Sequence, residues 1–270
     1  MIRKKIVYGI ALGMLSVMSS LTSCTGNESE GVVPEEFGTL KLGLTTGNGF
    51  DIAAGRAVDV SPYNKVENYK IEILKGKKIV QEFASIKDVP ESIKLTNGTY
   101  QVRASYGTEH AMSRDEFLSQ DVQEVLVKAN KQVVSLTCKP TCAKVQVNFS
   151  EEMDTYFADY KVSFSTAALG SESAPWAKGD TDPWYLLVNP KGEEVKATIQ
   201  LTPKKEYQTP AGSVSRTYTL KPNECWTLNV APKYTAQNGQ LGITITIDTR
   251  TDDIPVDIVV PSDWITATNE

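Results

Sequence analysis

The most informative shortage in this sequence is histidine, because the 270 residues contain one. A Ser-His-Asp triad or a histidine-containing metal site would depend on that residue, His110, which lies in the polar stretch 107–112. No G-x-S-x-G elbow and no glycine-rich phosphate loop occurs. Adjacent carboxylates such as Glu151 and Glu152 would point to opposite faces of a strand. We therefore expect no enzyme, no cofactor and no metal ion, with His110 a solvated loop residue.

Basic clusters are also scarce. The formal net charge is −5, and three of the 28 basic residues are Arg3, Lys4 and Lys5, at the very start. A nucleic-acid-binding protein normally carries a basic patch that neutralises phosphates. The rest of the chain has no such patch, so we exclude nucleic acid as a partner.

Long apolar runs are absent too. The longest lies in residues 6–18, which is shorter than the roughly 20 apolar residues that a membrane-spanning helix needs. It follows the basic residues and precedes the small residues Ser19 and Ser20. A charged start, an apolar middle and small residues at the end are typical of an export signal.

Leu21-Thr22-Ser23-Cys24 resembles the lipobox of bacterial lipoproteins. The resemblance implies that residues 1–23 are a lipoprotein signal peptide and that Cys24 becomes the acylated first residue. Two or three acyl chains would hold the protein on a membrane. Residues 24–36 are polar and acidic and are predicted to form a flexible tether. Acidic residues after the cysteine also resemble the surface-export signal of Bacteroidota lipoproteins. We expect an outer-membrane anchor and surface exposure, with a periplasm-facing anchor as the alternative.

Three further cysteines remain: Cys138, Cys142 and Cys225. Alternation places Cys138 with the core-facing residues of its segment, whereas Cys142 and Cys225 alternate against the apolar residues that follow them. A Cys142–Cys225 disulfide is one prediction. A Cys138–Cys142 bridge across the turn at Pro140 and simple thiols are the alternatives.

Alternating apolar and polar residues recur along most of the chain and are typical of half-buried antiparallel strands. The segments with this pattern are 39–45, 68–74, 98–106, 132–137, 143–149, 160–164, 195–201, 217–220, 226–230 and 241–247. Turn residues such as Asn97-Gly98 and Asn238-Gly239 separate them. The fold class is therefore predicted to be all-β.

Two tandem antiparallel β-sandwiches, Ig-like or transthyretin-like, are the predicted architecture. Asn68-Tyr69-Lys70-Ile71 is echoed by Asp159-Tyr160-Lys161-Val162, and Pro140 interrupts two strand-like segments. We place the N-terminal sandwich at residues 37–139 and the C-terminal sandwich at 140–270. Each has an ordinary sandwich size.

The lipobox, FGTLKLGL, NYKIEIL, DVPESIKLTNGTYQVRAS and the stretch from KANKQVVSLTCKP to DYKV together resemble an uncharacterised lipoprotein family of Bacteroides and relatives. That family is grouped with fimbrillin-like cell-surface proteins, and the resemblance covers residues 37–164 best. It implies a two-domain β-sandwich with an adhesive or pilus-like role. It also implies cleavage between Arg56 and Ala57, which would remove the first strand and admit a strand of another subunit. The alternative is an uncut linker.

An aromatic cluster at residues 174–187, which we expect to form a loop outside the alternating segments, is the candidate ligand site. Trp176, Trp184 and Tyr185 could stack on sugars or anchor a protein partner, and Asp180 and Asp182 could add hydrogen bonds or bind calcium weakly. The alternative is that the tryptophans plug one end of the sandwich. The first function predicted is a structural or adhesive, fimbrillin-like surface lipoprotein. The second is a glycan-binding lipoprotein of a polysaccharide-uptake system.

Overall fold

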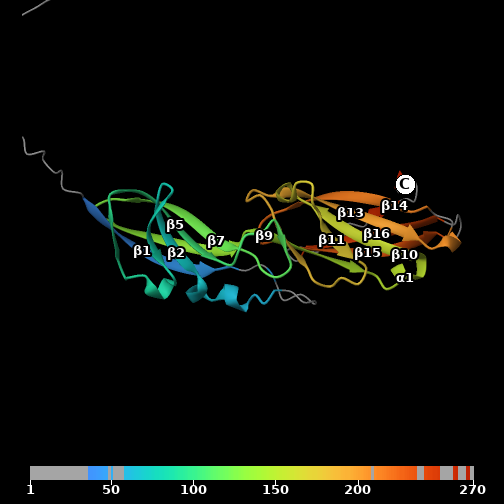
Figure 1. Ribbon diagram of the computed structural model, residues 1–270, viewed down its shortest axis with the longest axis horizontal. Helices are drawn as coiled ribbons and strands as arrows, with labels where there is room; N and C mark the ends of the chain where they lie inside the picture. The colour runs from blue at the N-terminus through green and yellow to red at the C-terminus, as the bar shows by residue number, and fades with distance from the viewer. Residues whose placement is uncertain are drawn as a thin grey trace, which may run out of the picture. The chain divides into compact units, whose positions relative to one another are not determined.

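The computed structural model describes residues 36–47, 50, 58–207, 210–235, 240–249, 258–260 and 266–267, most of which form β-strands (Figure 1). The strands follow from side-chain alternation. In β8 (Lys131–Pro140), Val134, Leu136 and Cys138 are buried while the residues between them are exposed, because successive side chains of a strand point to opposite faces. In the described part of the chain, no helix is long and apolar enough to cross a membrane.

Seven strands from the first half of the described chain form one sheet, in the order β3-β2-β5-β7-β8-β1-β4. These are β1 (Phe37–Thr46), β2 (Lys70–Lys75), β3 (Lys78–Phe83), β4 (Ile93–Thr96), β5 (Gly98–Tyr106), β7 (Ser119–Val127) and β8, with short 3-10 turns η1 (Ser61–Asn64), η2 (Val66–Asn68) and η3 (Ile86–Asp88). Leu40 and Leu136 from the β1–β8 side share a buried core with Ile71 and Val102 from the β2–β5 side. The sheet therefore folds over onto itself as a sandwich.

Two further sheets hold the other strands of the described residues. One has the order β11-β10-β13-β14-β18, and the other has the order β17-β16-β15-β9-β12-β6. Their core combines Val145 and Ile243 of the second sheet with Phe164 and Ile199 of the first. The elements are β6 (Met112–Ser113), β9 (Cys142–Phe149), α1 (Met153–Tyr156), β10 (Phe157–Ser165), η4 (Ala167–Leu169), β11 (Ala174–Ala177), β12 (Trp184–Leu187), β13 (Glu193–Pro203), η5 (Lys205–Tyr207), β14 (Gly212–Leu220), β15 (Cys225–Thr235), β16 (Gln240–Thr249), β17 (Ile258–Val260) and β18 (Thr266–Ala267).

Two strand pairs depart from the expected antiparallel arrangement. β1 runs parallel to β8, with Thr39–Thr46 opposite Lys131–Cys138, and β9 runs parallel to β15. Parallel neighbours need a long connection, and in both pairs several other strands lie between the two in the sequence. Side-chain alternation is the same in parallel and antiparallel strands, so the sequence pattern carries no information on direction.

The predicted all-β class is thus confirmed, whereas the division at residues 139 and 140 stays a prediction. The described residues belong to one compact unit, Glu35–Glu270. The seven-stranded sheet ends at Pro140 and β9 begins at Cys142, so Thr141 alone separates the two halves along the chain. The short strand β6, from the first half, nevertheless pairs with β12 in the second half. The two halves are therefore joined by this strand pair as well as by the chain at Thr141.

Candidate functional site

The aromatic cluster predicted as a loop lies on two strands. Trp176 is in β11, where it stands opposite Val162 of β10, and it is 1% exposed within the core of the second half. Trp184 and Tyr185 are in β12, between β9 and β6. Tyr185 is also 1% exposed, and Trp184 is half-buried. The expectation that these rings lie outside the strands was wrong, because each strand has only four residues and offers too little alternation to detect.

Arg114 contacts most of this predicted site. Its guanidinium lies over the Trp184 ring, 4.3 Å from the centroid, and 5.5 Å from the centroid of Trp176. The same group donates a hydrogen bond of 2.8 Å to Asp180 and one of 3.1 Å to the carbonyl of Pro175. A cation over indole faces is stabilised by the ring quadrupole. The chain thus fills its own aromatic site with one of its own side chains.

The two aspartates of the predicted site have different surroundings. Asp180 also accepts a hydrogen bond of 3.0 Å from the backbone N–H of Ala177, so its carboxylate holds the turn and the guanidinium of Arg114 together. A guanidinium at this distance opposes cation binding by Asp180. Asp182 accepts a hydrogen bond from the Thr181 hydroxyl. Ligand binding stays a prediction for the five residues of this site: Trp176, Trp184, Tyr185, Asp180 and Asp182. In this structure the rings of Trp176 and Tyr185 face inward.

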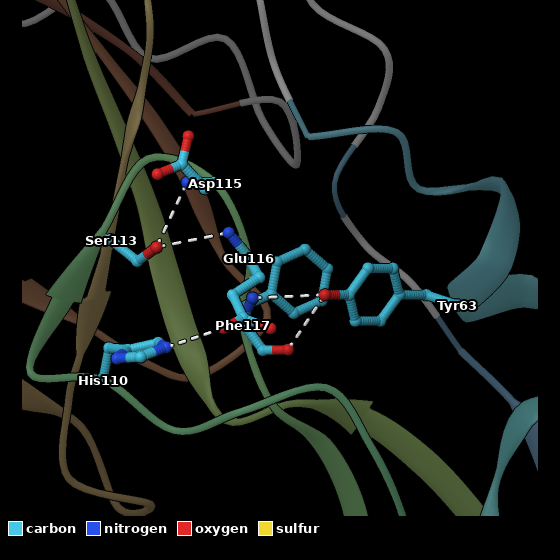
Figure 2. Close-up of polar contacts among 6 residues, drawn as sticks. All are labelled: Tyr63, His110, Ser113, Asp115, Glu116 and Phe117. Atoms are coloured by element: carbon cyan, nitrogen blue, oxygen red, sulfur yellow. Dashed lines mark hydrogen bonds and ion pairs between the residues drawn. The ribbon is translucent and has the colours of Figure 1, made fainter.

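Residues 107–118, which we call the junction loop, connect β5 to β7 and include Arg114. The Ser113 hydroxyl accepts hydrogen bonds from the backbone N–H groups of Asp115 and Glu116, which turns the loop just after β6 (Figure 2). Leu187 donates a backbone hydrogen bond to Ala111 beside the β6–β12 pair. The loop is thereby attached to the second half by main-chain hydrogen bonds on one side and by Arg114 on the other.

An aromatic core closes the junction on the other face of β12. Tyr63 donates a hydrogen bond of 3.0 Å to the carbonyl of Phe117 and accepts one of 3.2 Å from its N–H (Figure 2). The two rings are stacked with centroids 4.0 Å apart, and Phe117 also contacts Phe50 and Tyr185. Burial raises the pKa of the Tyr63 hydroxyl, so it stays protonated as this donor.

Cys142 completes this aromatic core and corrects a prediction. It is buried among Phe50, Tyr63, Phe117 and Tyr185 rather than facing outward, and it is a free thiol. The predicted Cys142–Cys225 disulfide is therefore not present in this structure, and neither is a Cys138–Cys142 bridge, since Cys138 is also a free buried thiol. Alternation misled here because β9 is covered on both faces, so neither face is the outer one.

His110 lies in the junction loop, as expected, but it has a partner. Its Nε2 atom is 2.9 Å from Glu116 Oε1, and both side chains are more than 40% exposed (Figure 2). This hydrogen bond is the main cause that lowers the pKa of Glu116 below its usual value. An exposed pair of this kind contributes little stability.

Two predicted sites lie outside the described residues: the lipidation site Cys24, with the signal and tether before Glu36, and the Arg56–Ala57 cleavage site. The structure adds four residues that the sequence did not indicate, namely Arg114, Phe117, Tyr63 and Phe50. None lies in an alternating segment, and Tyr63 is in a 3-10 turn. The aromatic Phe117, two residues before β7 in a polar loop, was the one available signal.

A family model described as a domain of unknown function, DUF4493, matches residues 36–262. The chain belongs to this family. The match confirms the expected uncharacterised family and extends well beyond residues 37–164, where the sequence resemblance was strongest. No curated protein matches the DUF4493 chain.

Solved structures to which the chain is similar come from Bacteroides and Parabacteroides species. A protein provisionally named a cell adhesion protein from Bacteroides eggerthii is 11% identical with a TM-score of 0.39, covering 80% of this chain and 96% of its own. A fimbrial assembly protein from Parabacteroides distasonis is 10% identical with a TM-score of 0.36, covering 83% and 98%. A provisionally named polysaccharide-binding protein from Bacteroides thetaiotaomicron is 11% identical with a TM-score of 0.39, covering 86% and 98%. Likeness at this level carries no argument about function.

Proposed function

We propose that this DUF4493 chain is a non-enzymatic lipoprotein of the cell envelope, exposed at the surface and anchored through Cys24, with a structural or adhesive role. The lipobox and the acidic residues after it support the anchor and the compartment. The observation that supports the structural role best is the junction between the two halves of the described chain.

That junction is built to resist bending. Thr141 is the one residue between β8 and β9, and both its N–H and its hydroxyl donate to the carbonyl of Leu118. The β6–β12 pair and the contact between the Phe117 and Tyr185 rings, whose centroids are 5.0 Å apart, join the two halves at separate points. Halves of a chain joined by a single linker normally move relative to one another, whereas an apolar interface opposes this motion. A stiff two-part body suits a protein that supports or presents a contact, rather than one that closes on a substrate.

The aromatic residues of the predicted ligand site support the same conclusion. A glycan-uptake protein of the second predicted class would need the faces of Trp176 and Trp184, and Arg114 lies against both. We therefore favour the structural or adhesive role over glycan uptake through these residues.

The anchor and the role are tested together in the source bacterium. In wild-type cells the protein should be found in the outer-membrane fraction, and protease added to intact cells should degrade it. In cells with Cys24→Ala the protein should be absent from that fraction. Cys225→Ala, which removes a different cysteine, should leave fractionation unchanged. Deleting the gene should reduce attachment of cells to host-cell or mucin-coated surfaces, and complementation should restore it. Unchanged attachment and unchanged surface structures after deletion would contradict the proposed role.

Cleavage between Arg56 and Ala57 remains a prediction with one decisive measurement. β1 lies between β8 and β4, with Leu40 fully buried, so its removal would open the sheet along both neighbours. Intact mass of the protein extracted from cells should show either a chain that begins at acylated Cys24 or one that begins at Ala57. A chain that begins at Cys24 would rule out processing and keep β1 in place.

A further inference from the structure

Three tyrosines form a cluster that no part of the junction uses. Tyr156 ends α1, Tyr207 ends η5 and Tyr234 lies near the end of β15. Each ring contacts the other two: the centroids are 5.3 Å apart for Tyr156 and Tyr207, 5.7 Å for Tyr156 and Tyr234, and 5.6 Å for Tyr207 and Tyr234. We call these residues the tyrosine cluster.

The cluster lies at the end of the C-terminal sheets that is farthest from the junction. β9 leaves the junction at Cys142 and ends at Phe149, just before α1. β15 is parallel to β9, so Tyr234 lies toward the same end. β1, which follows the tether, begins instead at the end of the seven-stranded sheet away from the junction, because β8 runs parallel to it and ends at Pro140. The tyrosine cluster therefore lies at the end of its sheets away from the junction, and β1 begins at the end of its own sheet away from the junction.

Backbone contacts hold the rings in place. The N–H of Lys204 donates 3.0 Å to the carbonyl of Tyr156, and the N–H of Tyr207 donates 3.1 Å to the carbonyl of Lys204. Tyr156 and Tyr207 are half-buried against the core, whereas the Tyr234 side chain is 42% exposed. Two rings of the cluster are thus packed against the core, and the third ring is exposed to solvent.

The surroundings favour a sugar over a protein as the ligand. Among the residues after Val133 whose burial the structure describes, Tyr234 is the one large hydrophobic side chain that is strongly exposed. Its sequence neighbour Lys233 and the residues before Tyr207, Lys204 to Glu206, are polar or charged. A stable protein interface buries about 800 Å² per partner around an apolar centre. A small aromatic patch with a polar surround matches instead the apolar face and hydroxyl rim of a pyranose ring.

We propose that the tyrosine cluster is a carbohydrate-binding surface that stacks pyranose rings of a neutral polysaccharide on Tyr234 and its two partners. This inference rests on the proposed function, since it supplies the ligand class for the adhesive role. Aromatic rings combine an apolar face with little rotamer freedom, and tyrosine adds a hydroxyl at the rim.

The test uses the full mature chain, purified in detergent with its anchor, against starch, yeast mannan, laminarin and arabinoxylan by affinity electrophoresis and calorimetry. We expect binding to at least one of them. Tyr234→Ala and Tyr156→Ala should each weaken that binding about tenfold, whereas Tyr234→Phe, which keeps the ring, should weaken it less. Phe37→Ala removes an exposed ring of β1 and should bind like the wild type. Thermal unfolding confirms that each variant is folded.

The outcomes separate this inference from the proposed function. Lack of binding to all four polysaccharides, or binding that Tyr234→Ala leaves unchanged, would overturn the inference. A third outcome is that the protein binds no polysaccharide, yet cell adhesion depends on Tyr234 and is abolished when the target surface is treated with protease. This outcome would identify a protein ligand. That result would overturn the sugar and keep the adhesive role. Binding through Tyr234 without any loss of attachment after gene deletion would keep the sugar site and overturn the role.

Discussion

The guanidinium of Arg114, from the first half of the described chain, lies over the ring of Trp184, from the second half, 4.3 Å from its centroid. Asp180 holds the other side of the same guanidinium at 2.8 Å. Two residues that the sequence singles out as ligand-binding therefore bind a side chain of the chain itself, and they join the two halves.

Replacing Arg114 should destabilise the junction. Arg114→Ala removes a stacked cation and a charge-assisted hydrogen bond and leaves the Asp180 carboxylate without its guanidinium, so we expect a loss of about 2–3 kcal/mol in the free energy of unfolding. Urea unfolding monitored by tryptophan fluorescence measures this loss. A double-mutant cycle with Trp184→Ala should give a coupling of about 0.5–2 kcal/mol.

Arg216 offers the matched control for that cycle. It donates a hydrogen bond to the carbonyl of its neighbour Ser215 and takes no part in the junction contacts described above. Arg216→Ala combined with Trp184→Ala should be additive within about 0.5 kcal/mol. An Arg114–Trp184 coupling equally close to zero would show that the stacking contributes no stability.

Two glycines with the same φ angle allow the cost of a left-handed backbone to be distinguished from the cost of a steric clash. Gly107 and Gly179 both have φ of +84°. A Cβ at Gly107 would lie 2.0 Å from the carbonyl oxygen of Phe117, whereas a Cβ at Gly179 meets nothing within 4 Å. Gly179→Ala should cost about 1–2 kcal/mol for the left-handed conformation alone. Gly107→Ala should lower the melting temperature clearly further, in calorimetry of both variants, and equal losses would contradict the close approach of the junction loop.

The two buried thiols should be unreactive in the folded protein. Burial raises the pKa of Cys138 to about 12, and burial also raises the pKa of Cys142. Because the thiolate is the reactive form, labelling with a thiol reagent at about pH 8 should be very slow. In a Cys24→Ala, Cys225→Ala variant, we expect labelling of both thiols in denaturant and negligible labelling without it. Rapid labelling of the native variant would show that Cys142 is accessible.

Glu72 should make stability depend on pH in the acid range. Burial opposes its ionisation, but hydrogen bonds from Lys70 and Arg103 and their charges hold its pKa below the usual value. Since the folded-state pKa is lowered, the stabilisation is present above the unfolded pKa and is lost as the pH falls through the folded value. The stability difference between wild type and Glu72→Gln should therefore be largest near neutral pH and shrink in acid.

Glu82 provides the control, because it shares the partner Lys70 at 3.2 Å but its side chain is 50% exposed. Urea unfolding from neutral pH down to about pH 3 should show a much smaller pH-dependent difference for Glu82→Gln. A difference for Glu72→Gln that stays constant with pH would mean that Glu72 does not ionise differently in the two states.

Alternation predicted those strands that have one buried and one exposed face. In β8 the buried residues Val134, Leu136 and Cys138 alternate with exposed ones, and the sequence placed a strand there. The same reasoning placed Cys142 on the wrong side, since β9 has core on one face and the aromatic junction on the other. It also missed β3 and β7, whose exposed Ile79, Val80 and Val122 obscure the pattern.

The junction could not be predicted from the sequence because its partners are far apart in the chain. Arg114 and Asp180 are separated by 66 residues, and Tyr63 and Phe117 by 54. Neither pair shares a periodic segment, and no local preference brings them together. The sequence did identify Trp184 and Tyr185 as unusual residues, but their role follows from which loop packs against them.

The parallel pairing of β1 with β8 determines how the protein would respond to force. A load applied along the chain enters β1 at Phe37 and leaves β8 at Pro140, toward β9. Since the strands are parallel, this load slides one along the other and strains the bonds from Thr39 to Thr46 together, whereas a hairpin pulled at its open end breaks one bond at a time. With the anchor at Cys24 that we propose, a cell held in flowing liquid would load these strands in shear, the direction in which their hydrogen bonds act together.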